Sequence, residues 1–116
     1  MGLNFIKISS RILFLFFLIV IEYLATTSIS IKVIENSWDK ANHFVAFFVL
    51  FITLSTGFPN IKLIGRILLL MFFGIQIEIV QAFLPFREFS LLDILADFVG
   101  VVIGIATSKI LQNIIR

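Results

Sequence analysis

The hydrophobic positions of this 116-residue chain fall into four long apolar runs, and short polar segments separate them. The runs cover residues 12–31, 41–58, 63–84 and 91–111. Each run has about the length of a helix that crosses a membrane, which needs about 20 residues for a hydrocarbon layer of roughly 30 Å. Pro59 and Pro85 fall in the separating segments, where proline favours a helix end because it lacks the amide hydrogen. The pattern predicts four transmembrane helices.

Composition leads to the same class of protein. Hydrophobic residues make up 60% of the chain, 15 of them phenylalanine, and charged residues make up 14%. A soluble domain of this length cannot bury so large an apolar fraction. The chain has no cysteine, and its net charge of +2 is too small and too dispersed for a nucleic-acid surface. We therefore predict an all-α, four-helix bundle, a single domain over residues 1–116, as a multi-pass protein of the cytoplasmic membrane.

The first apolar run resembles a secretory signal because Lys7 and Arg11 precede it. A signal peptide has an apolar region of roughly 7–15 residues, which is shorter than residues 12–31. No convincing small-x-small cleavage motif ends the run, although residues 25–30 are rich in small side chains. We predict a retained first span.

Basic residues predict the orientation of the four helices, since they are enriched on the cytoplasmic side. Six of the nine lie at the termini and the middle loop: Lys7, Arg11, Lys62, Arg66, Lys109 and Arg116. Both termini are therefore predicted to be cytoplasmic. Acidic residues concentrate at the opposite, outer end, and only Glu22 lies elsewhere, near the middle of the first run.

Three of the predicted helices carry polar residues on one face of their outer ends. Asp39 and His43 are four residues apart at the start of the second helix, with Lys40 beside them. Glu78 and Gln81 share a face near the end of the third. The antiparallel fold of the spans predicts that these faces meet those of the last helix.

The last helix combines carboxylates with small residues on one stripe. Asp93 and Asp97 are followed by Gly100 and Gly104, a small-x-x-x-small pattern that lets a neighbouring backbone approach. The carboxylates should therefore face the interior of the bundle. We expect Gly104→Leu to destabilise the fold by about 1–3 kcal/mol, and we take Val101 as a lipid-facing position.

Structural roles explain part of this pattern. Ser90 and Asp93 fit a helix capping box, and Asp39 fits an N-cap. Arg87 and Lys40 can extend to lipid headgroups. A purely structural role is less favoured for three residues that lie a turn or two inside the apolar boundary, where an unpaired charge costs roughly 2.5–3.5 kcal/mol. These are Glu78, Gln81 and Asp97.

Taken together, the blocks resemble the VanZ-like family of small membrane proteins over roughly residues 37–104. The matching positions are Asp39, Lys40, His43 and Phe44, then Glu78, Gln81, Pro85 and Arg87, then Ser90, Asp93, Gly100 and Gly104. Asp97 departs from the pattern, which usually has asparagine there. The resemblance implies a membrane protein of the cell envelope. The family takes its name from a component linked to resistance to glycopeptide antibiotics, chiefly teicoplanin, and its biochemical activity is not defined.

Three classes of function remain open. The first is binding of a membrane lipid, such as a phosphate-bearing envelope lipid, by Asp39, Lys40, His43, Glu78, Gln81, Arg87, Asp93 and Asp97. The second is an enzyme acting on such a lipid, with His43, Glu78 and Asp93 as catalytic candidates and His43 as acid/base. The third is a structural membrane protein, with a homo-oligomer left open. We predict no metal, because no ligand spacing is recognisable in the sequence, and no cofactor.

Overall fold

The computed structural model describes residues 2–27, 39–85 and 89–115 of the chain, and the regular elements in these residues are all α-helices. Their bounds are α1 Gly2–Thr26, α3 Asp39–Gly57, α4 Leu63–Ala82 and α5 Leu91–Ile115. The predicted all-α bundle is confirmed. For α4 and α5 the first residue agrees with the predicted one.

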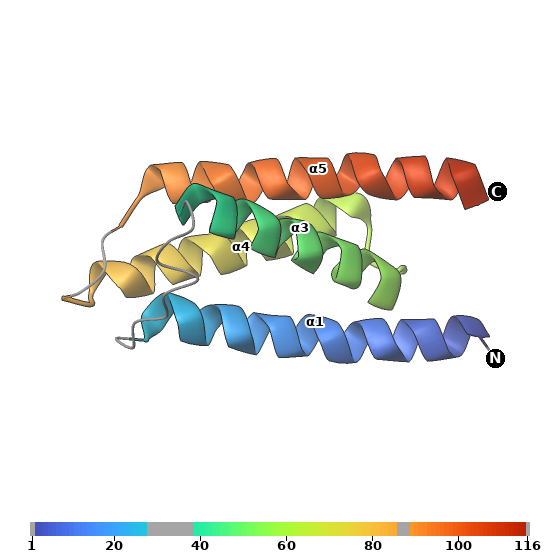
Figure 1. Cartoon of the computed structure of the whole chain (residues 1–116), viewed down its shortest axis with the longest axis horizontal. Helices are drawn as coiled ribbons and strands as arrows, with labels where there is room; N and C mark the ends of the chain where they lie inside the picture. The colour runs from blue at the N-terminus through green and yellow to red at the C-terminus, as the bar shows by residue number, and fades with distance from the viewer. Residues whose placement is uncertain (1, 28–38, 86–88, 116) are drawn as a thin grey trace.

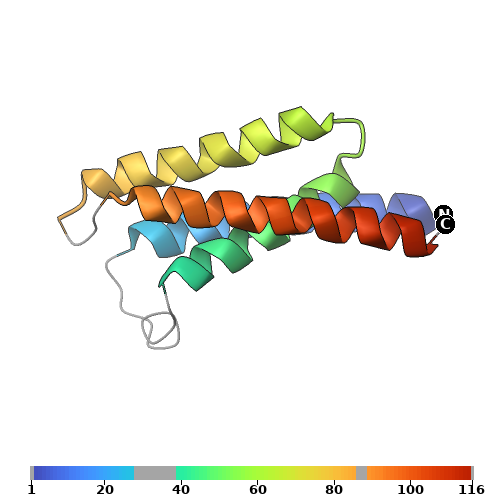
Figure 2. The same ribbon diagram turned by 90° about the horizontal axis from the view of Figure 1, so that it is seen from above.

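The helices form an elongated bundle of 48 × 24 × 24 Å (Figures 1 and 2). α3 has its most extensive contacts with α5 and then with α1, and α4 contacts all three. The start of α1 and the end of α5 lie at the same end, here called the terminal end (Figure 1). The end of α1, the start of α3, the end of α4 and the start of α5 lie at the opposite end, here called the polar end.

Among the described residues, three helices are long and apolar enough to cross a membrane, over Asn4–Thr26, Leu63–Ala82 and Leu91–Asn113. The apolar part of α3, Ala41–Gly57, is shorter and lies at the lower limit of about 17 residues for a span. Large apolar side chains are exposed along the outside, as at Phe72. Lipid is the solvent that suits such a surface, so the chain is a multi-pass membrane protein.

The first helix begins about ten residues before the predicted span 12–31 and therefore extends beyond it. Lys7 and Arg11 precede the predicted span in the sequence, and both lie inside α1. Arg11 Nε donates a hydrogen bond to the Gly57 carbonyl at 2.7 Å. The Arg11 guanidinium also lies 5.0 Å from the Phe58 ring centroid. These contacts hold the charged side chain of Arg11, which lies inside α1, against the end of α3.

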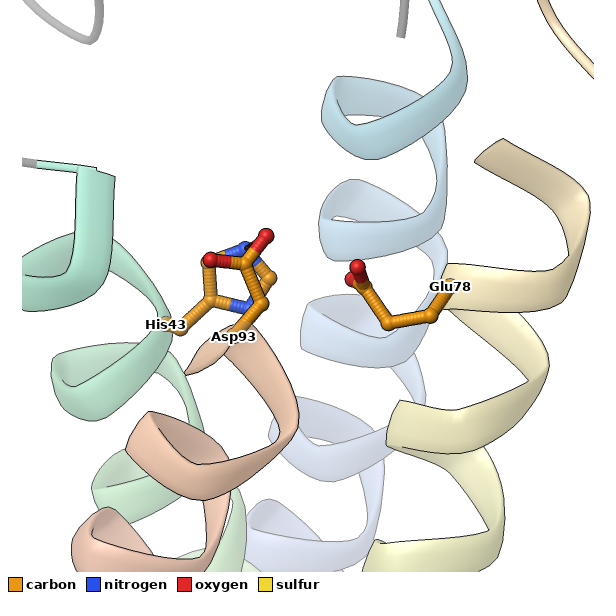
Figure 3. A group of neighbouring side chains, drawn as sticks. All are labelled: His43, Glu78 and Asp93. Atoms are coloured by element: carbon orange, nitrogen blue, oxygen red, sulfur yellow. Dashed lines mark ion pairs between the residues drawn. The ribbon is translucent and has the colours of Figure 1, made fainter. Parts of the chain in front are cut away.

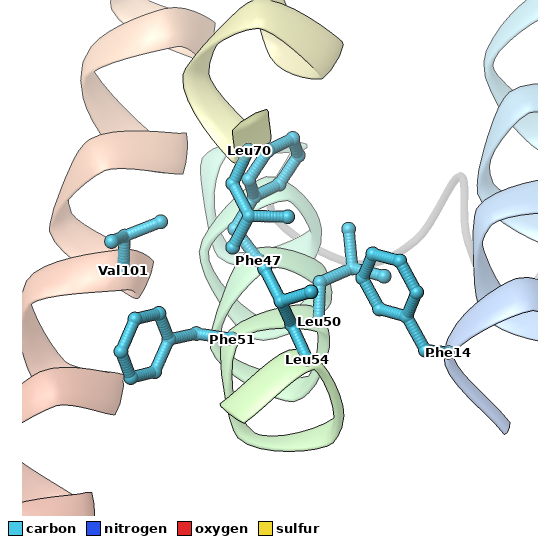
Figure 4. Close-up of a cluster of buried hydrophobic side chains, with 7 residues drawn as sticks. All are labelled: Phe14, Phe47, Leu50, Phe51, Leu54, Leu70 and Val101. Carbon is cyan, nitrogen blue, oxygen red and sulfur yellow. The ribbon is translucent and has the colours of Figure 1, made fainter. Parts of the chain in front are cut away.

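The apolar core gathers around α3 (Figure 4). Its buried side chains are Phe14 from α1, Phe47, Leu50, Phe51 and Leu54 from α3, Leu70 from α4 and Val101 from α5. The α3 residues recur at intervals of three and four, the spacing of one helix face. This core joins all four described helices in the part of the bundle between the polar end and the terminal end.

The predicted close approach of α5 is present. A Cβ atom at Gly100 would meet the backbone carbonyl of Phe44, and one at Gly104 would meet the Phe51 side chain at 2.9 Å. Val101, however, is fully buried, so its assignment to the lipid face was wrong. Val101 lies four residues after Asp97 and therefore continues the same buried stripe.

We predict that the terminal end is cytoplasmic, because the basic residues cluster in the segments that form it. A reporter fused after Arg116 should then be active only if it works in the cytoplasm, and one inserted between α1 and α3 only if it works outside. A fusion at the end of the chain that is active only outside would reverse the orientation.

Candidate functional site

Polar side chains from three helices meet at the polar end of the bundle. We call His43, Glu78, Asp93 and Asp97 the polar cluster. His43 lies on the first turns of α3, Glu78 on the last turns of α4, and the two aspartates on the first turns of α5. They meet because α3 and α5 begin at the end where α4 finishes (Figure 1). The structure thus brings together four of the eight residues predicted to bind a ligand.

His43 lies between the two aspartates of α5. Its Nδ1 is 2.9 Å from Asp97 Oδ1, and its Nε2 is 3.4 Å from Asp93 Oδ2. Asp97 is almost completely buried, with an exposed fraction of 1%. A carboxylate that accepts from one ring nitrogen fixes the orientation and the tautomer of an imidazole.

Glu78 faces His43 and Asp93 from α4 and is fully buried. Its Oε1 accepts a hydrogen bond from the Ser90 backbone N–H at 2.9 Å. Its Oε2 is buried and has no hydrogen-bond partner among the described residues. Figure 3 shows the carboxylate pointing from α4 toward His43 and Asp93.

The start of α5 confirms a structural role for Ser90. The Asp93 backbone N–H donates to Ser90 Oγ at 3.3 Å, which is the N-cap interaction that the Ser-x-x-Asp spacing predicts. The cap places Asp93 in the first turn of α5, and the bond from Ser90 to Glu78 ties that turn to α4.

Gly74 makes room for Asp97. A Cβ atom at Gly74 would meet Asp97 Oδ2, so a larger residue there would displace the carboxylate. Asp97 Oδ2 is another buried oxygen without a hydrogen-bond partner in the described part of the chain. The buried stripe of α4 therefore serves both to receive Asp97 and to present Glu78.

Polar bonds also join α4 to α1. Gln81 Nε2 donates to the Ala25 carbonyl at 2.9 Å, so this predicted ligand residue bridges two helices. Gln76 Nε2 donates to Glu22 Oε1 at 2.7 Å. Because α1 ends at Thr26, Glu22 lies about one turn from the polar end and not near the middle of its helix. Gln76 had not been singled out, although a lone amide inside an apolar run was the available signal.

The structure does not describe the side chains of the remaining predicted ligand residues. Asp39 and Lys40 form the first turn of α3, but their side chains are not described, and Arg87 falls in the undescribed segment 86–88. The predicted charge network of Glu78 with Arg87 or Lys40 therefore stays a prediction.

The cluster can act chemically in two ways. Its carboxylate oxygens can receive hydrogen bonds or bind a cation, and the imidazole of His43, held by Asp97, can exchange a proton. It lies close to the ends of the apolar spans: Asp93 is two residues after Leu91 and Glu78 four before Ala82. At about 1.5 Å per residue, this is a depth of about 3–6 Å for these two residues, and of about 9 Å for Asp97, six residues after Leu91.

Comparison with known proteins gives the family. The sequence model of the VanZ/LLP1 family matches residues 3–112, nearly the whole chain. No curated protein and no solved structure matches the chain. The resemblance seen in the motifs of the polar end is therefore confirmed over almost the full length: the chain belongs to the VanZ/LLP1 family.

Proposed function

We propose that this protein binds the polar headgroup of a membrane lipid at the polar cluster. The observation that carries the proposal is the placement of buried, incompletely hydrogen-bonded carboxylates at the ends of apolar helices. The headgroup layer on each side of a bilayer is about 5–8 Å thick, so the cluster lies next to the depth at which headgroups are found.

The hydrogen bonding of the cluster indicates what kind of headgroup fits. Glu78 Oε2 and Asp97 Oδ2 are acceptors, and a buried acceptor without a partner costs about 1–3 kcal/mol. Hydroxyl or amine groups of a headgroup would supply the missing donors. A phosphate on the same lipid suits Arg87, whose guanidinium can bind it in a bidentate fork, and Lys40 as a point charge.

The location of the site follows from the predicted orientation. If the terminal end is cytoplasmic, the polar cluster faces the outside of the cell, where envelope lipids are used. The family resemblance extends the proposal to a phosphate-bearing envelope lipid and to sensitivity toward glycopeptide antibiotics. The apolar surface of α4 and α5 would lie along the lipid tail.

We expect Glu78→Gln to abolish lipid binding and to leave folding nearly unchanged. Glutamine keeps the size of the side chain and an acceptor for the Ser90 N–H, but it removes the charge and one acceptor. Arg87→Lys, which removes the guanidinium fork, should weaken binding of a phosphate-bearing lipid. Native mass spectrometry of the purified protein measures the bound lipid, and thermal unfolding in detergent measures the fold.

Glu22→Gln is the matched control, since it makes the same chemical change outside the cluster and keeps an acceptor for Gln76. It should retain the lipid. Loss of folding and lipid in parallel would make the cluster a structural scaffold. Retention of the lipid in both Glu78→Gln and Arg87→Lys would contradict the proposal.

A second function, catalysis on the bound lipid, is favoured by one contact. Asp97 Oδ1 lies 2.9 Å from His43 Nδ1, the arrangement in which a carboxylate orients an imidazole that acts as general acid or base. Ser90 is an unsuitable nucleophile because its hydroxyl caps α5. Turnover of the co-purified lipid that is lost in His43→Gln would establish the enzyme, whereas an unchanged lipid over many hours would leave binding alone.

A further inference from the structure

We propose that His43, Glu78 and Asp93 hold a divalent transition-metal ion, with Zn²⁺ as the preferred ion. One potential ligand atom from each residue lies within 4.8 Å of the other two. Ligand atoms on one tetrahedral zinc ion, at about 2.0–2.2 Å from it, are separated by roughly 3.3–3.6 Å. Side-chain rotations that move the ligand atoms by about 1 Å therefore suffice to close the site around an ion.

Glu78 supplies an independent reason to place a ligand here. Its side chain is fully buried and is directed into the space beside His43 and Asp93 (Figure 3). One carboxylate oxygen is used by the Ser90 N–H, and the other has no hydrogen-bond partner among the described residues. A cation between Glu78 and its two neighbours would satisfy this oxygen in place of a headgroup donor, and Asp97 Oδ2 would remain as the acceptor for the headgroup.

The contact between His43 and Asp97 orients the imidazole for metal binding. When Nδ1–H donates to Asp97 Oδ1, the lone pair of Nε2 points to the side where Asp93 lies. A metal-binding histidine almost always donates its other ring N–H to a carboxylate or carbonyl in this way, which fixes the ring and raises its basicity. Asp97 is then a positioning residue, which acts on the ion through His43.

The ligand set determines the class of ion. One imidazole nitrogen and two carboxylates suit zinc, because imidazole favours zinc over magnesium and calcium. Two carboxylates and a neutral imidazole also balance the charge of a dication. Three protein ligands leave a coordination position open, as in zinc sites that bind a water or a substrate. The sequence shows no metal-ligand spacing because the three ligands come from three helices.

The competing arrangement has a proton in place of the ion. A doubly protonated His43 would donate to Asp97 from Nδ1 and to Asp93 from Nε2, without a role for Glu78 Oε2. The two arrangements differ in one measurable respect. Only the metal site depends on Glu78, His43 and Asp93 together.

The test measures metal content on full-length protein from which any purification tag has been removed. The protein is delipidated in detergent, stripped with a chelator, and titrated with Zn²⁺ in competition with a chromophoric chelator. We expect one Zn²⁺ per chain, and at least a 100-fold rise in Kd for both Glu78→Gln and His43→Gln. Asp97→Asn should raise Kd by about 10–100-fold, as loss of an orienting partner does. Mg²⁺ and Ca²⁺ should not compete.

Glu22→Gln is again the control and should bind Zn²⁺ as the unmodified protein does. If a cluster variant does not fold, the unmodified protein still decides: Zn²⁺ should raise its midpoint of thermal unfolding, and a chelator should reverse the rise. Substoichiometric binding, or an unchanged Kd in Glu78→Gln and His43→Gln, would overturn the inference. Since no lipid is needed for these measurements, the metal site can fail while lipid binding stands, and the reverse.

Discussion

Gly100→Ala is expected to destabilise the bundle by at least about 3 kcal/mol, the upper end of the usual range for overpacking. The added methyl group would meet the backbone carbonyl of Phe44 and lie 3.1 Å from the Phe48 nitrogen. A backbone cannot rotate away as a side chain does, so α3 and α5 must separate. Helix propensity alone predicts the opposite sign, a gain of about 1 kcal/mol for alanine over glycine. Unfolding of the purified protein in mixed detergent micelles measures the difference.

Two comparisons on α5 isolate the cause. Gly104→Ala should cost less than Gly100→Ala, because its methyl group meets side-chain atoms of Phe51 at 2.9–3.1 Å, whereas that of Gly100→Ala meets a backbone carbonyl more closely. Val102→Leu should be nearly silent, since Val102 is 44% exposed on the lipid side. If Gly100→Ala stabilises the protein instead, α3 and α5 do not approach each other at Phe44.

Asp97→Ala is expected to cost about 1–3 kcal/mol of stability, because it leaves the His43 Nδ1 donor inside the bundle without its carboxylate. It should also abolish whichever activity depends on the orientation of His43. A double-mutant cycle with His43→Phe measures the coupling. We expect the double variant to be more stable than the sum of the two single changes predicts, since both members of the pair are then absent.

Asp97→Asn separates charge from hydrogen bonding. Asparagine keeps an oxygen that can accept from His43 Nδ1, and it is the residue that usually occupies this position in the family pattern. The variant should therefore fold nearly as well as the unmodified protein. Equal losses of stability in Asp97→Asn and Asp97→Ala would show that the charge, and not the acceptor, holds His43.

The sequence predicted the helices best where a breaker or a cap coincides with the end of an apolar run. Ser90 caps α5, and α4 ends shortly before Pro85. The sequence did not predict the start of α1, because Lys7 and Arg11 carry charge without breaking the helix. Arg11 is accommodated by the end of α3, a contact between residues 46 positions apart that no local pattern reveals.

The sequence predicted which helix faces meet at the candidate site, but it did not predict the hydrogen bonds between their side chains. Residues four apart share a face, and this spacing correctly brought Asp93 and Asp97 to the interior. It could not show that His43 lies between them. The same rule, applied one step further along α5, also places Val101 in the interior. Gln76 was missed because it lies off the face defined by Gly74 and Glu78.

The buried face of α4 has a consequence for how the protein is made. Only two of its five buried residues are apolar, Leu70 and Ile77, and the others include Glu78 and Gln81. The partners of Gln76 and Gln81 lie on α1, which is synthesised first, whereas Glu78 bonds to Ser90, twelve residues later in the chain. During translation Gln76 and Gln81 of α4 can thus bond to α1, which is already in the bilayer. The Glu78 carboxylate has no such partner until Ser90 has been synthesised. We expect α4 and α5 to enter the membrane as a hairpin, so that Glu78 meets the start of α5 before it meets lipid.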